Sequence, residues 1–225
     1  MTFLSLVRTA TIRYMDFGNI IAVLVIIFVS MTLHELTHGI VAYKLGDDTA
    51  HLMGRLTLNP LKHIDPIMTI ALPMTIIFAN ALTGAAMPVF GGAKPVPFNS
   101  ENLKYGEWGV AMVAASGPLV NLLLAFMSYA IVTYIGDGSV AGKLLATSVA
   151  VNLGFFAFNI IPIPPLDGSR VFYAIAPDFI RRFFGAVEYY GIVFIYIAVL
   201  ALSPVLTVYM QAVIYGCVSL FSLVI

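Results

Sequence analysis

Two histidines and a glutamate lie close together in a long apolar stretch of the chain. In His34-Glu35-Leu36-Thr37-His38 the histidines are four residues apart, and in a helix this spacing places both side chains on one face. Two imidazoles so placed can occupy adjacent corners of a tetrahedral zinc site. Glu35 lies about 100° around the helix from His34, so it can reach a water at the open corner. The pattern predicts a zinc site with Glu35 as the general base.

The third protein ligand must come from elsewhere in the chain. A hydrolytic zinc site keeps three protein ligands and one water, whose pKa the metal lowers toward neutrality. Because the one cysteine is Cys217, we expect the third ligand to be His, Asp or Glu. His51 and His63 follow the apolar stretch and remain alternatives. Asp167 is favoured, because a carboxylate that ends an apolar span costs a few kcal/mol unless it is paired.

The composition of the chain favours a functional metal site over a chance occurrence of the motif. A histidine–glutamate–histidine pattern also occurs by chance on solvated helices of soluble proteins. This chain is 60% hydrophobic and only 10% charged, whereas a soluble domain is about a quarter charged. It is therefore predicted to be an integral membrane protein, in which unpaired His and Glu side chains would be costly. A net charge of zero provides none of the positive potential that nucleic-acid binding needs.

The expected fold is an all-α polytopic membrane protein made of one membrane-embedded domain, residues 1–225. A spanning helix needs about 20 apolar residues. Five segments meet this need approximately, namely 18–44, 109–135, 144–164, 186–202 and 205–225. We expect 1–17 to lie on the bilayer surface, 18–175 to form the catalytic core and 186–225 to form a C-terminal helical hairpin. Within the core, Ser116 and Gly117 favour close helix packing.

Residues 67–90 are apolar, but prolines, an asparagine and a glycine interrupt them, so hydropathy does not decide whether they cross the bilayer. If Asp167 joins His38, the spans that carry these two residues must run in the same direction. A crossing by 67–90 would put them about a bilayer thickness apart. We therefore expect this segment to be re-entrant.

The distribution of Lys and Arg supports the same topology. With 67–90 re-entrant, the predicted zinc side holds Lys44, Arg55, Lys62, Lys94, Lys104, Arg170, Arg181 and Arg182. The other side holds Arg8, Arg13 and Lys143. By the positive-inside rule, the site is expected near the cytoplasmic surface of the cell membrane.

Three motifs resemble those of the site-2 protease family, the intramembrane zinc metalloproteases. They are His34-Glu35-Leu36-Thr37-His38-Gly39, Ser116-Gly117-Pro118-Leu119-Val120-Asn121, and the run from Asn159-Ile160-Ile161-Pro162 to Leu166-Asp167-Gly168. Residues 54–66 and 93–97 are similar to stretches of a small bacterial and archaeal branch without PDZ or other accessory domains. The resemblance implies that His34, His38 and Asp167 bind one Zn²⁺, that Glu35 is the catalytic acid and base, and that Asn159 orients the substrate.

The expected reaction is hydrolysis of a peptide bond in a transmembrane protein substrate. A helical substrate hides its carbonyls in its own hydrogen bonds, so the enzyme must hold an extended stretch. Arg55-Leu56-Thr57-Leu58 alternates like a short strand and offers an edge for it, although an ordinary surface hairpin is the alternative. For Asn159 the alternative is a cap on the broken helix.

A rival hypothesis is a metal-ion transporter or a metal-binding scaffold that uses the same polar residues. It would equally explain polar side chains inside a membrane. Most other predicted spans have no acidic or histidine residue that could form a second ion site, which favours the enzyme.

Overall fold

The computed structural model describes residues 17–71, 74–75, 78 and 92–225. The described residues are mostly helical, and none of them is assigned to a strand. The long helices are α2 (Phe17–Lys44), α5 (Glu107–Ile135), α6 (Val140–Asn159), α8 (Asp178–Ala201) and α9 (Ser203–Val224). The shorter ones are α3 (Thr49–Leu52), η1 (Pro60–Lys62), η2 (Pro66–Ala71), η3 (Ser100–Asn102) and α7 (Asp167–Ile175). This confirms the all-α polytopic fold.

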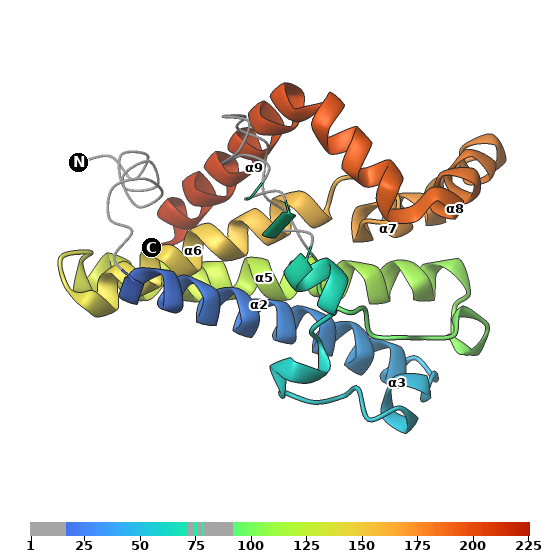
Figure 1. The fold of residues 1–225 in the computed structure, drawn as a ribbon, viewed down its shortest axis with the longest axis horizontal. Coiled ribbons are helices and arrows are strands. Elements are labelled where there is room, and N and C mark those ends of the chain that lie inside the picture. Colours follow the sequence, from blue (N-terminus) through green and yellow to red (C-terminus); the bar gives the residue numbers. More distant parts are fainter. Residues whose placement is uncertain (1–16, 72–73, 76–77, 79–91) are drawn as a thin grey trace.

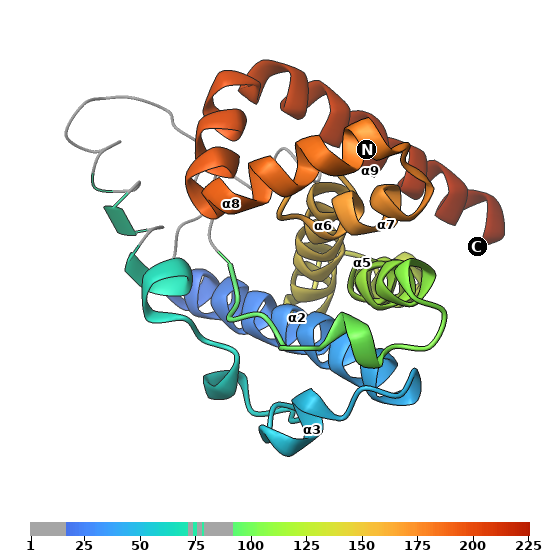
Figure 2. The same ribbon diagram turned by 90° about the vertical axis from the view of Figure 1, so that its right-hand side faces the viewer.

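Helices α2, α5 and α6 lie side by side and form the centre of the molecule (Figure 1). Helices α2 and α6 run in the same direction, and α5 runs in the opposite one. Figure 2 shows α8 and α9 on one side of this group and α3 on the other. Ala125, Val149, Leu153 and Phe221 form a core cluster that joins α5, α6 and α9.

Four helical segments of the described residues are long and apolar enough to cross a membrane, namely Ile21–Lys44, Glu107–Ile135, Val140–Asn159 and Pro204–Val224. They match four of the five expected spans. The fifth, 186–202, falls largely within α8, and many side chains of α8 lie outside the described part. The expected surface helix at 1–17 lies almost wholly outside the described residues as well.

Helix α6 is displaced toward the N-terminus relative to the expected span 144–164. It begins at Val140, because the Ser139 hydroxyl accepts a hydrogen bond (3.0 Å) from the Gly142 N–H and caps the helix. It ends at Asn159, because Pro162 has no N–H and its ring would clash with the preceding turn. The chain then turns through Pro164 and Pro165 into α7.

The chain leaves α2 and enters α5 at the same end of the helical group. The Lys104 N–H donates to the Leu45 carbonyl oxygen over 2.8 Å. The Lys94 N–H donates to the His63 carbonyl oxygen, also over 2.8 Å, so the segment between these two residues starts and finishes at one place. Most of 72–91 lies outside the described residues, and the re-entrant path itself remains a prediction. Its two flanks nevertheless lie on one side of the molecule.

Candidate metal centre

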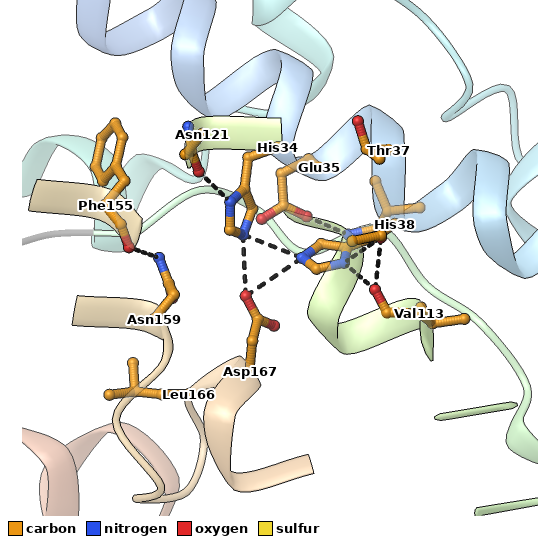
Figure 3. A network of polar contacts seen from close by, with 12 residues as sticks. His34, Glu35, Thr37, His38, Val113, Asn121, Phe155, Asn159, Leu166 and Asp167 are labelled. Atoms are coloured by element: carbon orange, nitrogen blue, oxygen red, sulfur yellow. Dashed lines mark hydrogen bonds and ion pairs between the residues drawn. The ribbon is translucent and has the colours of Figure 1, made fainter. Parts of the chain in front are cut away.

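Helix α2 presents both histidines of the predicted zinc motif toward α5. Each histidine is only 8% exposed. Their Nε2 atoms lie 3.0 Å apart, as expected for residues separated by one helical turn (Figure 3). The motif that the sequence predicted as a metal site therefore faces the protein interior.

Asp167 reaches the same point from the first residue of α7. Its Oδ2 atom lies 3.0 Å from His34 Nε2 and 3.4 Å from His38 Nε2 (Figure 3). Of the alternatives, His63 is buried elsewhere, with its Nε2 donating to the Thr57 carbonyl oxygen over 2.9 Å. The structure thus brings together the three side chains that the sequence favoured as ligands.

The spacing of these three donor atoms fits a zinc ion. With metal–ligand bonds of about 2.0–2.1 Å, tetrahedral geometry separates two ligand atoms by about 3.3 Å. The three separations here are 3.0, 3.0 and 3.4 Å. The three side chains are therefore spaced as a group that could hold one zinc ion.

The other ring nitrogen of each histidine is held by the protein. His34 Nδ1 lies 2.6 Å from Asn121 Oδ1, and His38 Nδ1 lies 2.7 Å from the Val113 carbonyl oxygen. Both partners are acceptors, so Nδ1 carries the proton and Nε2 keeps a lone pair directed at the centre. Convergent lone pairs of this kind suit a cation and cannot satisfy one another.

Helix α5 contributes two irregular features to the centre. Pro118 has no N–H to donate to the Ala114 carbonyl oxygen, and the neighbouring Val113 carbonyl oxygen accepts from His38 Nδ1. Gly117 faces the ligands, and an added Cβ would overlap His38 Nε2 and come within 2.6 Å of His34 Nε2. The small residue allows the close approach that the sequence predicted, and its neighbours are the two imidazoles.

Glu35 points toward the extended segment before η3. Its Oε2 atom accepts a hydrogen bond of 2.9 Å from the Val96 N–H (Figure 3). Val96 stands between Pro95 and Pro97, so it supplies the one N–H of this three-residue run. This bond fixes the carboxylate beside the two histidines.

Asn159, expected to orient substrate or to cap its helix, does donate to its own helix. Its Nδ2 atom lies 3.0 Å from the Phe155 carbonyl oxygen in the last turn of α6 (Figure 3). The bond uses one of the amide's two hydrogens and does not use its oxygen.

Residues 55–58 differ from the strand-like edge that the sequence suggested. The Thr57 N–H bonds the Arg55 carbonyl oxygen over 3.0 Å, which is a tight turn and not an extended strand. Arg55 is buried, with 7% of its surface exposed, and donates to the carbonyl oxygens of Lys94 (2.9 Å) and Pro95 (3.3 Å). Leu56 packs onto Gly39 of α2, whereas Leu58 is 67% exposed.

Sequence reasoning missed the interactions that support the ligands. The Val113 contact uses a backbone carbonyl, which leaves no trace in the residue type. The role of Asn121 was visible only as part of a motif, although a buried amide in an apolar span is a signal for a polar partner. Asn152, which contacts Asn121 over 2.9 Å, was not singled out at all.

Together, the helical fold and the convergent donors indicate a multi-pass membrane protein with a two-histidine, one-carboxylate group that could hold a metal. The chain is 37% identical over 187 residues to a Bacillus subtilis protein named "Putative zinc metalloprotease YwhC", covering 79% of this chain and 78% of that protein. It is 29% identical to two proteins named "Putative zinc metalloprotease Rip2". The Mycolicibacterium smegmatis protein matches 94% of this chain and 79% of its own length, and the Mycobacterium tuberculosis H37Rv protein 83% and 69%.

The chain therefore belongs to the site-2 protease family and is a zinc metalloprotease that acts on protein substrates. Its cofactor is Zn²⁺, in agreement with the donor set described above. No family model matches the chain. No solved structure matches it either.

Proposed function

We propose that this protein hydrolyses peptide bonds of membrane-anchored proteins within or near the bilayer of the cell membrane. His34, His38 and Asp167 hold the zinc ion, and Glu35 is the general base. The observation that carries the proposal is the convergence of Nε2, Nε2 and Oδ2 within 3.0–3.4 Å of one another, beside a carboxylate, in a multi-pass helical protein.

When held by His34, His38 and Asp167, Zn²⁺ would supply a Lewis acid for the scissile carbonyl and for the attacking water. Glu35 takes a proton from that water and delivers it to the nitrogen of the leaving amine. The Val96 N–H holds one oxygen of Glu35, which leaves the other for the water. The Asn159 amide oxygen accepts from the backbone of the substrate and keeps it in register.

Two cavities beside α7 support a path for an extended substrate. A polar cavity of about 420 Å³ is lined by Val96, Ser100, Glu107, Arg170 and Tyr173 among others. An apolar cavity of about 330 Å³ lies between α5, the end of α6 and α7. Val96, whose N–H bonds Glu35, lines the polar cavity, and Gly168, next to Asp167, lines the apolar one, which supports chemistry between a polar and an apolar compartment. Leu58, 67% exposed, remains a proposed substrate contact.

Changing Glu35 to Gln tests the assignment of the base. The amide retains the shape of the side chain but cannot take a proton, so we expect zinc content to be unchanged and cleavage of a membrane-anchored peptide to fall by about 10²- to 10⁴-fold. Glu101→Gln is the matched control, because Glu101 is an exposed acidic residue of η3, and it should cleave normally. Cleavage by the Glu35→Gln variant at the wild-type rate would exclude Glu35 as the base.

The same variants separate the enzyme from the rival transporter. A transporter that uses these residues would move zinc across proteoliposome membranes, and an enzyme would not. Mass spectrometry of membranes that contain wild-type or Glu35→Gln protein would then identify the cut peptides and the residues around each cut. Zinc uptake without peptide cleavage would favour the transporter.

A further inference from the structure

A chain of buried polar side chains leads from His34 into the interface between α5 and α6. His34 Nδ1 contacts Asn121 Oδ1 over 2.6 Å, and Asn121 Nδ2 donates to Asn152 Oδ1 over 2.9 Å. Asn152 Nδ2 in turn donates to the backbone carbonyl oxygen of Ser148 over 2.9 Å. Asn121 and Asn152 are 0% and 1% exposed, so water cannot replace these partners.

The last partner in this chain fixes the direction of every bond before it. A backbone carbonyl oxygen can only accept, so the NH₂ group of Asn152 must face Ser148 and its oxygen must face Asn121. Asn121 then has to turn its NH₂ group to Asn152 and its oxygen to His34. His34 must donate from Nδ1, which leaves Nε2 unprotonated and able to bind a metal.

We propose that Asn152 is a positioning residue that sets the tautomer of His34 through Asn121. If the Asn121 amide were reversed, its NH₂ group would donate to Nδ1, and the ring proton would move to Nε2, where it excludes a metal. His38 needs no such relay, because its Nδ1 faces the Val113 carbonyl oxygen directly. The inference rests on the proposed function only in taking His34 as a zinc ligand.

The direct test is the zinc affinity of Asn152→Leu, measured in detergent by competition with a chelator. Leucine removes the acceptor that orients Asn121, and we expect the affinity to fall by about 10- to 100-fold. Ser128→Ala is the matched control. Ser128 Oγ lies 2.9 Å from Ser148 Oγ, which accepts from Asn152 Nδ2 over 3.3 Å, but the Ser148 carbonyl oxygen orients Asn152 whether or not the Ser128 hydroxyl is present. Its zinc affinity should equal that of the wild type.

A second substitution separates orientation from packing. Asn121→Asp places two equivalent oxygens beside His34, so either can accept from Nδ1 without help from Asn152. Adding Asn121→Asp to Asn152→Leu should restore zinc affinity. If Asn152→Leu weakened binding only through a packing defect, this second substitution would not restore it. Should Asn152→Leu fail to fold, Asn152→Ala removes the same acceptor with a smaller side chain.

The proposal is overturned if Asn152→Leu binds zinc like the wild type, if Ser128→Ala weakens binding equally, or if the double variant stays weak. None of these outcomes depends on peptide cleavage. A wild-type protein that binds zinc but cuts no membrane-anchored peptide would contradict the proposed function and leave the role of Asn152 intact.

Discussion

The two histidines leave no room for a side chain at Gly117 of α5. A Cβ at this position would overlap His38 Nε2 and lie 2.6 Å from His34 Nε2, closer than real Cβ contacts allow. In Gly117→Ala the rings must move out of their positions around the metal. We expect zinc affinity to fall by at least about 100-fold, because the ligand atoms must stay within about 0.2 Å of their ideal distances. Zinc content after dialysis against a chelator measures the loss.

Gly154→Ala is the control for this substitution. Gly154 also lies inside a long helix, but an added Cβ there meets nothing within 4 Å. Alanine at such a position favours the helix by up to about 1 kcal/mol, so zinc affinity should be unchanged and thermal stability equal or higher. If both variants lost zinc alike, the effect would come from the helix and not from the space beside the histidines.

Residue spacing in the sequence predicts the side chains of the candidate metal centre, but not the contacts that support them. The two histidines were predictable because a separation of four residues places side chains on one helical face whatever the surroundings. Asp167 was predictable because an acidic residue at the end of an apolar span needs a partner. Val113 acts through its backbone and Asn152 through a second amide. Neither contact follows from local sequence, because each depends on how two helices are set against one another.

At the scale of elements, Arg55 connects the loop after α3 to the segment that holds Glu35. Its guanidinium donates to the carbonyl oxygens of Lys94 and Pro95, one residue before the Val96 N–H that bonds Glu35. Arg55→Met retains the apolar stem and removes these donors. We expect zinc affinity to be retained and the kcat for peptide cleavage to fall by about tenfold or more, since misplacing a catalytic group by 1 Å can cost about 100-fold.

Lys62→Met, at an exposed basic residue of η1, controls for the loss of one positive charge in the same loop. It should cleave like the wild type. If Arg55→Met raised KM alone and left kcat unchanged, Arg55 would contribute to substrate binding, as the sequence first suggested, and not to the position of Glu35.

The Asp47 side chain connects the turn after α2 to the segment before α5 through hydrogen bonds. Its carboxylate is fully buried and accepts from the Thr49 hydroxyl (2.6 Å), the Asn99 N–H (3.0 Å) and the Asn102 amide (3.0 Å). Burial by itself would raise the pKa of Asp47, but these hydrogen bonds outweigh it and lower that pKa below its ordinary value. The ionised carboxylate therefore stabilises the fold.

This stabilisation depends on pH in a definite direction. Because the pKa of Asp47 is lower in the folded protein, its contribution is present above the pKa of the unfolded chain, about 3.9, and is lost as the pH falls through the folded value. We expect Asp47→Asn to lower the melting temperature in detergent at pH 7, and the difference from the wild type to shrink below about pH 4. A difference that stayed constant with pH would contradict an ionised Asp47.

The ends of the elements were harder to predict than their existence. The spans at α2 and α5 followed from about 20 or more apolar residues, since a bilayer demands that length. The end of α6 was placed too late, because Ile160, Ile161 and Ile163 keep this stretch apolar although Pro162 and Pro164 cannot continue the helix. Residues 55–58 alternate like a strand, but the buried partners of Arg55 fold them into a turn.

For the whole molecule, the direction of the helices decides which side of the membrane holds the metal centre. Helix α5 has 29 residues and is about 43 Å long, enough to separate its two ends by a full bilayer. The candidate ligands belong to the end where α2 finishes and α6 leads into α7, and the end where α5 meets α6 is the opposite one (Figure 1). The excess of Lys and Arg at the first end predicts that it faces the cytoplasm.

Single cysteines in a Cys217→Ser protein test this orientation in cells. The cysteine is introduced by Asp137→Cys or by Glu101→Cys. Position 137 lies in the exposed turn between α5 and α6, and position 101 lies in η3 before α5, on the side of the metal centre. A maleimide that cannot cross membranes should label position 137 in intact cells and position 101 only after the membrane is opened, because α5 separates the two. Both positions should react in detergent, which shows that each thiol is accessible. Labelling of position 101 and not 137 in intact cells would place the metal centre outside, against the distribution of basic residues.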